Sequence, residues 1–173
     1  MKHAQQAITF CMFVLLIAVG SGCASTSSDD KKPSEKYSTL RLYGAATPDQ
    51  TGRHQIVEVY RRTPIQLTVA STPFLDEGYN VQATVIETVG GFSLRIQYDS
   101  QGAGRLENAT HRMRNQHIAI HSNFPESRWL AAPLVNAPIS DGVLVFTPDA
   151  SREEADRIAS GLNELAERLR KKK

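Results

Sequence analysis

The 173-residue sequence contains only two cysteines, Cys11 and Cys23, and both lie close to its N-terminal end. The chain after Cys23 therefore lacks the thiols that a disulfide framework or a cysteine-based metal site requires. An excess of one charge is also missing, because 20 basic and 18 acidic side chains leave a formal net charge of +2 at pH 7. No basic stripe is interleaved with aromatic residues, so a nucleic-acid partner is not expected.

Motifs of the common enzyme sites are absent too. No Gly-Xaa-Ser-Xaa-Gly segment occurs, and Gly102 and Gly104 lack the third glycine of a dinucleotide-binding fingerprint. His111, His117 and His121 invite a metal-binding interpretation. However, four residues of strand separate His117 from His121 by about 13 Å, whereas zinc binds nitrogen ligands at about 2.0–2.1 Å. The sequence therefore predicts no catalytic residue, no metal ligand and no cofactor.

The chain also has no hydrophobic run long enough to span a bilayer. Its longest run, residues 8–19, is interrupted only by Thr9. As a helix it would cover about 18 Å, against about 30 Å of hydrocarbon. Lys2 lies before this run, and Gly20, Ser21 and Gly22 follow it. A positive start, a short apolar core and small residues at its end are typical of an export signal.

Residues 1–22 resemble the signal peptide of bacterial lipoproteins, which is cleaved before a lipid-modified cysteine. That cysteine would be Cys23, and acyl chains on it would form a stable membrane anchor. Gly20 departs from the aliphatic residue that is usual in such signals. Ala24 follows the cysteine, and by resemblance to Gram-negative sorting rules it favours the outer membrane, facing the periplasm. Plain secretion with cleavage near Gly22 or Ala24, and a retained membrane anchor, remain as alternatives.

The segment after Cys23 predicts a tether. Residues 24–36 contain almost no apolar side chains, so they cannot bury enough surface to offset their chain entropy. A flexible chain of this length reaches on the order of 20 Å. Residues 23–36 are therefore expected to connect a lipid anchor to a domain over residues 37–173.

A hairpin over residues 80–98 is the clearest strand pattern in that domain. Phe92, Leu94 and Ile96 alternate with polar residues, which is the period of a half-buried strand. The glycine pair 90–91 predicts the turn, with Val89 opposite Phe92 and Val85 opposite Ile96. Further strands are expected at residues 37–43, 55–60, 64–70, 116–122, 129–135 and 143–146.

Two helices are expected. The first covers residues 100–115, and the second follows Ser151, which forms a capping-box pattern with Glu154. A continuous apolar stripe marks the second helix, and basic residues at its end complement the helix dipole. This order predicts an α+β fold, with a ferredoxin-like antiparallel sheet, two helices on one face, and an added N-terminal strand ribbon.

Residues 64–162 resemble the head part of the first periplasmic domain of SecD, a protein-translocase subunit. The similar segments occur in the same order in both, and they are residues 73–75, 85–92, 98–103, 117–120, 132–139 and 153–155. SecD has multiple membrane spans and uses the proton gradient, whereas this chain shows no span after its signal. The resemblance implies contact with another polypeptide in the envelope.

Together these features predict a non-enzymatic bacterial envelope lipoprotein that binds an envelope protein or an unfolded polypeptide. Strand addition to an exposed sheet edge is one expected binding mode. Two other classes stay open. A small ligand-binding or hydrolytic envelope protein would show a deep pocket with clustered polar groups, and a passive structural lipoprotein would have no specific partner.

Overall fold

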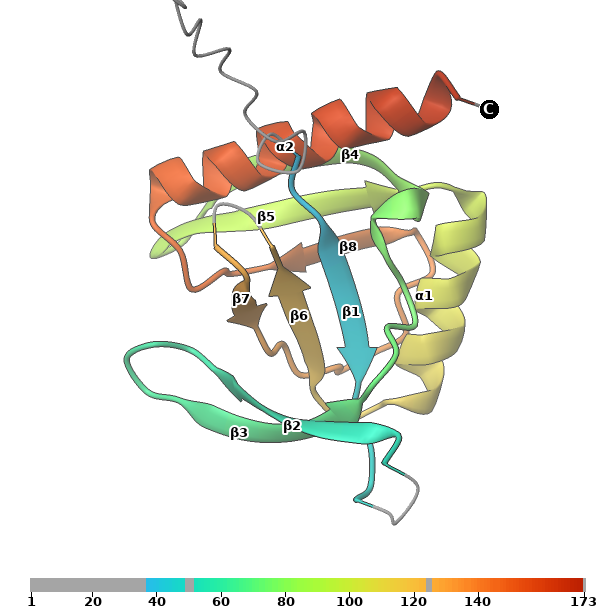
Figure 1. The fold of residues 1–173 in the computed structure, drawn as a ribbon, viewed down its shortest axis with the longest axis vertical. Helices are drawn as coiled ribbons and strands as arrows, with labels where there is room; N and C mark the ends of the chain where they lie inside the picture. The colour runs from blue at the N-terminus through green and yellow to red at the C-terminus, as the bar shows by residue number, and fades with distance from the viewer. Residues whose placement is uncertain (1–36, 49–51, 124–125, 173) are drawn as a thin grey trace, which may run out of the picture. The chain divides into compact units, whose positions relative to one another are not determined.

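The computed structural model describes residues 37–48, 52–123 and 126–172 (Figure 1). The predicted signal peptide, Cys23 and the predicted tether lie outside the described residues. In the described part, no helix is long and apolar enough to cross a membrane. The elements are β1 (Leu40–Gly44), β2 (His54–Val59), β3 (Ile65–Ala70), the 3-10 helix η2 (Glu77–Tyr79), β4 (Asn80–Thr88), β5 (Gly91–Tyr98), α1 (Ser100–Arg112), β6 (Ile118–Ser122), β7 (Arg128–Ala131), β8 (Val143–Phe146) and α2 (Arg152–Arg170).

The strands pair in three antiparallel groups: β4–β5–β8, β1–β6–β7 and the two-stranded ribbon β2–β3. From β4 onward the order is strand, strand, helix, three strands and helix, as predicted, and the ferredoxin-like α+β class is confirmed. β1 does not belong to the ribbon. It pairs with β6, because Leu40 and Leu42 are buried in the main core and need that neighbour.

The hairpin forms, but its predicted register is wrong by one residue on each strand. Thr88 faces Gly91 and Val85 faces Leu94, so the turn consists of Val89 and Gly90. Gly90 has a φ of 90°, which glycine adopts without steric cost. This shift keeps Val85 on the same face as Leu94 and Ile96, and the regular pairing is interrupted only between Asn80 and Gln82. Glu87, the residue that fits that apolar face badly, lies beside the turn with 73% of its side chain exposed.

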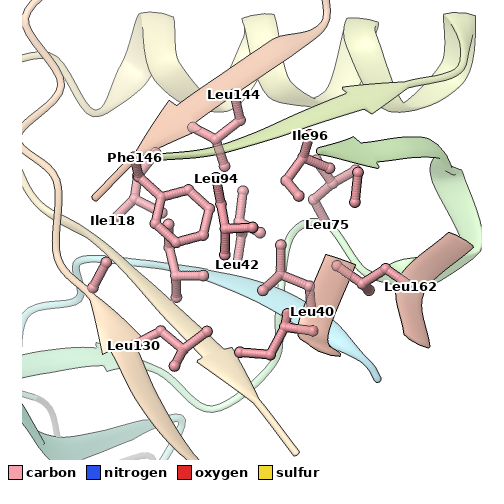
Figure 2. Packing of buried hydrophobic residues seen from close by; sticks show 14 of the residues in the cluster. Leu40, Leu42, Leu75, Leu94, Ile96, Ile118, Leu130, Leu144, Phe146 and Leu162 are labelled. Carbon is pink, nitrogen blue, oxygen red and sulfur yellow. The ribbon is translucent and has the colours of Figure 1, made fainter. Parts of the chain in front are cut away.

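The main core lies between the two three-stranded sheets and the helices (Figure 2). Leu106 of α1 and Leu162 of α2 join the same cluster as Leu94 and Ile96 of β5, so both helices cover one face of the β4–β5–β8 sheet. The side chains that are less than 2% exposed include Leu40, Leu42, Leu75, Leu94, Ile96, Leu106, Ile118, Ile120, Leu130, Ile158 and Leu162.

A second, smaller core attaches the ribbon. Side chains alternate along a strand, so Leu42 enters the main core while Tyr43 points to the other side of the β1–β6–β7 sheet. There Tyr43 packs with Val57 and Val59 of β2, which are 6% and 0% exposed. Trp129 lies half-buried against this cluster.

The predicted helix ends are partly confirmed. α1 begins after Asp99, whose side chain accepts a bond from the Gly102 N–H at 2.7 Å, and it ends at Arg112, three residues earlier than expected. α2 begins after Ser151, whose Oγ accepts a bond from the Glu154 N–H at 3.2 Å. The reciprocal half of the capping box does not form, because the Glu154 carboxylate is paired with an arginine of β7.

Candidate binding surface

Outward-facing backbone groups at the sheet edges show where a further strand could pair, and most of these edges are closed. β4 is the outer strand of its sheet, and α2 closes it. The Ala83 N–H donates to Asn163 Oδ1 at 2.7 Å, and Asn163 Nδ2 donates to the Ala83 carbonyl at 2.8 Å. Near the start of α2, Arg152 pairs with Glu87 at the other end of β4. α2 therefore runs along this edge and excludes another strand.

The outer edges of β1 and β7 are closed by loop backbone. The Leu42 N–H donates to the Leu75 carbonyl at 2.9 Å, and the Phe74 N–H donates to the Leu42 carbonyl at 2.9 Å. On β7 the Leu130 carbonyl accepts a bond from the Asp149 N–H at 2.7 Å. The sheet β1–β6–β7 therefore presents no free run of backbone at these positions.

β8 differs from these three edges. The Tyr98 N–H donates to the Gly142 carbonyl at 3.0 Å, and in an antiparallel pair this sets which residues of β8 bond to β5. By that alternation the backbone groups of Val143 and Val145 point away from β5. The Val143 N–H donates to the Asp141 carboxylate at 3.0 Å. The N–H and C=O of Val145 have no hydrogen-bond partner among the described residues, and the residue is 46% exposed.

The ribbon has a second open position, at Ile56 of β2. The Ser71 N–H donates to the Arg53 carbonyl at 2.9 Å, so the same alternation turns the Ile56 backbone away from β3. Ile56 is 68% exposed. A two-stranded ribbon is a weaker template than a three-stranded sheet that lies on the main core. β8 is therefore the better candidate edge.

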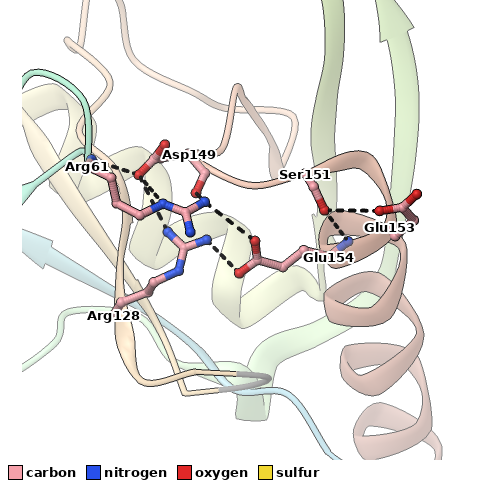
Figure 3. A network of polar contacts seen from close by, with 6 residues as sticks. All are labelled: Arg61, Arg128, Asp149, Ser151, Glu153 and Glu154. Carbon is pink, nitrogen blue, oxygen red and sulfur yellow. Dashed lines mark hydrogen bonds and ion pairs between the residues drawn. The ribbon is translucent and has the colours of Figure 1, made fainter.

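A network of four charged residues joins the ribbon, β7 and α2 (Figure 3). Arg128 Nη2 lies 2.5 Å from Glu154 Oε1, and these side chains are only 14% and 11% exposed. Asp149 Oδ2 accepts a bond from the Arg61 N–H at 2.9 Å and lies 3.6 Å from Arg128 Nη1. Each carboxylate thus faces guanidinium groups. This arrangement pairs charges that are largely shielded from solvent.

His111, His117 and His121 lie in different surroundings. Within the described residues, no group of three or more His, Cys, Asp or Glu side chains could hold a metal ion. His117 Nδ1 lies 2.7 Å from the Ala132 carbonyl, and His121 makes edge contact with Trp129 at 5.0 Å between ring centres. Burial, together with the nearby Arg41 cation, lowers the pKa of His121. His111 is exposed on α1.

Sequence reasoning missed the residues that close and open the edges. Asn163 lies in the middle of α2 beside the apolar stripe, among other polar residues, and no local pattern distinguishes it as the residue that closes β4. Val145 reads as one residue of a short apolar strand. The exposure of Val145 depends on which strands pair in the folded domain, so no local sequence pattern predicts it.

Comparisons with known proteins give a fold and no family. No protein-family model matches the sequence, and no curated protein matches it. Among solved structures, the membrane component SecDF that enhances protein export matches with a TM-score of 0.54 and 16% sequence identity, over 74% of this chain and 63% of that chain. SecDF in a super-membrane-facing form also gives 0.54, with 17% identity, over 73% of this chain and 18% of that chain.

The described domain has a SecDF-like fold. This supports the predicted SecD-like domain at the level of fold. The chain spans less than two thirds of the length of either SecDF chain. A role in protein export therefore cannot be carried over from the fold alone.

Proposed function

We propose that this chain is a non-enzymatic lipoprotein of the bacterial envelope, acylated at Cys23 and held at the outer membrane facing the periplasm. Its SecDF-like domain binds an extended segment of a protein or peptide partner. The predicted signal and the cysteine that follows it support the anchor. The SecDF-like fold supports a polypeptide partner, since the similar protein enhances protein export.

The open edge at Val145 is the observation that supports strand addition to β8 as the binding mode. An added strand would donate to the Val145 carbonyl and accept from the Val145 N–H, and the Val143 carbonyl would extend the ladder. Main-chain pairing of this kind needs no particular partner sequence, which suits a partner that is unfolded or variable. The half-exposed side chain of Val145 adds apolar contact on the outer face of the sheet.

A proline substitution tests this edge directly. Val145→Pro removes the outward N–H, and proline is tolerated at an edge strand where that N–H faces away from the sheet. Crosslinked pull-downs from bacterial envelopes would compare the natural chain, Val145→Pro and Val145→Thr, with thermal melting to verify the fold of each. We expect Val145→Thr to recover the same partner and Val145→Pro to recover at least tenfold less.

Ile56→Pro is the matched comparison on the ribbon. Loss of the partner in this variant alone would overturn the β8 edge in favour of the ribbon. If no protein exceeds the background of the Cys23→Ala chain, the partner itself is disproved. Palmitate labelling with and without Cys23 tests the anchor separately, and an unlabelled natural chain would contradict it.

A further inference from the structure

Charge is divided unevenly along α2. Its first part, residues 152–162, holds two arginines against three acidic residues. Its last part with the two following lysines, residues 163–172, holds four cations against two glutamates. The four are Arg168, Arg170, Lys171 and Lys172, and they lie at or near the surface. A chain of near-neutral total charge thus carries a local basic end.

Cations at the C-terminal end of a helix compensate the helix dipole, but this role explains only some of the four basic residues. Arg170 Nε donates to the Ala166 carbonyl at 3.4 Å, so it satisfies an end of the helix. Lys171 has 81% of its side chain exposed and lies 4.0 Å from Glu167, which is itself 65% exposed. An exposed pair of this kind contributes little to stability. Lys171 and Lys172 are therefore able to act on something outside the domain.

The described chain starts at this same end of α2. Ser38 lies against Gly161, where an added side-chain carbon would approach the Ser38 nitrogen to 2.7 Å. One residue earlier, the Tyr37 ring lies under the Arg168 guanidinium at 5.2 Å. Followed from Ser38 to Tyr37, the backbone thus heads toward the C-terminal end of α2. An open hollow of about 570 Å³ there is lined by Tyr37, Glu164, Glu167, Arg168, Lys171 and Lys172.

Apolar side chains border the basic residues. Leu169 is half-buried, and Val81, which is 37% exposed, lines the same small hollow as Leu169 and Arg170. Tyr37 adds a ring with one polar atom. Basic residues beside such amphipathic and apolar groups form the composition that binds at a membrane interface.

We infer that this surface, formed by Tyr37, Leu169, Arg168, Lys171 and Lys172, docks on the anionic phospholipid surface beside the lipid anchor. The inference rests on the proposed acylation of Cys23 for its setting. Thirteen residues lie between Cys23 and Tyr37, and a chain of this length spans at most about 50 Å when fully extended, so acylation at Cys23 would keep Tyr37 within that distance of the bilayer. At that range even weak electrostatic attraction orients the domain.

The test uses residues 37–173, which contain every described helix and strand and both hydrophobic cores, so acylation is not needed. Vesicles of equal parts phosphatidylglycerol and phosphatidylcholine are compared with vesicles of phosphatidylcholine alone, by cosedimentation at low salt. We expect binding to the anionic vesicles only, and its loss at high salt. Each cation near an anionic surface raises the binding affinity by a factor of roughly five. The double variant Lys171→Gln with Lys172→Gln should therefore weaken binding about 25-fold.

Arg53→Gln with Arg62→Gln is the control, because it removes the same charge from exposed positions before and after β2. Equal losses in both double variants would show a general charge effect and overturn the inference. No binding to anionic vesicles at low salt would overturn it too, as would tighter binding to polyglutamate, which would indicate an acidic protein partner. These results do not depend on Cys23, so they are distinguishable from a failure of the anchor.

Discussion

Asn163 of α2 takes the place of a neighbouring strand for Ala83 of β4. Its side-chain amide donates to the Ala83 carbonyl and accepts from the Ala83 N–H, at 2.8 and 2.7 Å. Unpaired edge strands invite uncontrolled pairing with other chains. The domain therefore closes the β4 edge with a helix, whereas the outward backbone groups of Val145 on β8 have no partner among the described residues.

Asn163→Ala removes both of these bonds. Ala83 is 1% exposed, so water cannot easily replace the lost partner. We expect the free energy of unfolding to fall by about 2–3 kcal/mol, measured by chemical denaturation. Asn108→Ala is the control, because its amide bonds the Gly104 carbonyl on the exposed side of α1 and its removal should change stability by less than about 0.5 kcal/mol. Equal effects of the two variants would contradict a closing role for Asn163.

Gly161→Ala should destabilise the domain although alanine favours helices. The added carbon would lie 2.5 Å from Ser38 Oγ and 2.7 Å from the Ser38 nitrogen, and the backbone nitrogen cannot rotate away. Overpacking of this kind costs about 1–3 kcal/mol, against a helix-propensity gain of about 0.5–1 kcal/mol. Gly104→Ala on α1 meets nothing within 4 Å, so it should be stabilising. Thermal melting of both variants gives the sign, and a higher melting temperature for Gly161→Ala would refute the contact.

Arg128→Met should be among the most damaging substitutions. It leaves the Glu154 carboxylate, which is 11% exposed, with only the more distant Arg61 at 3.8 Å. Removing one member of a buried ion pair costs about 3–5 kcal/mol. Arg152→Met, which breaks the exposed pairs with Glu87 and Asp156, should change stability far less, because exposed ion pairs contribute little. If denaturation shows equal losses for both, the network of Figure 3 has no special role in stability.

Because the Tyr98 hydroxyl is buried, we expect the folded domain to lose stability at high pH. This hydroxyl is buried without a hydrogen-bond partner in the described part of the chain. Burial, and to a smaller extent Asp76, raises the pKa of Tyr98 well above the ordinary 10.0. The unfolded chain therefore loses this proton first, so stability is complete below about pH 10 and falls as the pH rises further. Tyr98→Phe should be at least as stable as the natural chain at pH 7, because it removes a buried hydroxyl that has no partner, and it should lose less stability above about pH 10. Parallel losses of stability in the two chains, measured by chemical denaturation, would disprove the assignment.

Much of the local structure follows from short-range patterns. The periodicity of α2, the cap at Ser151 and the alternation in β5 each involve residues within a few positions of one another, so they can be read directly. The hairpin register was harder. The Gly90–Gly91 pair permits two turns that keep the same faces, and the turn forms at Val89–Gly90, one residue earlier than the glycine pair suggests.

The distant pairings could not be read in this way. Asn163 meets Ala83 across 80 positions, and Arg128 meets Glu154 across 26, so neither residue carries a local mark of its partner. The element order is a property of the chain itself, because it depends on residues that are close together in the sequence. Which edge is closed and which stays open depends on the packing of α2 against β4, since only folding brings those two segments together.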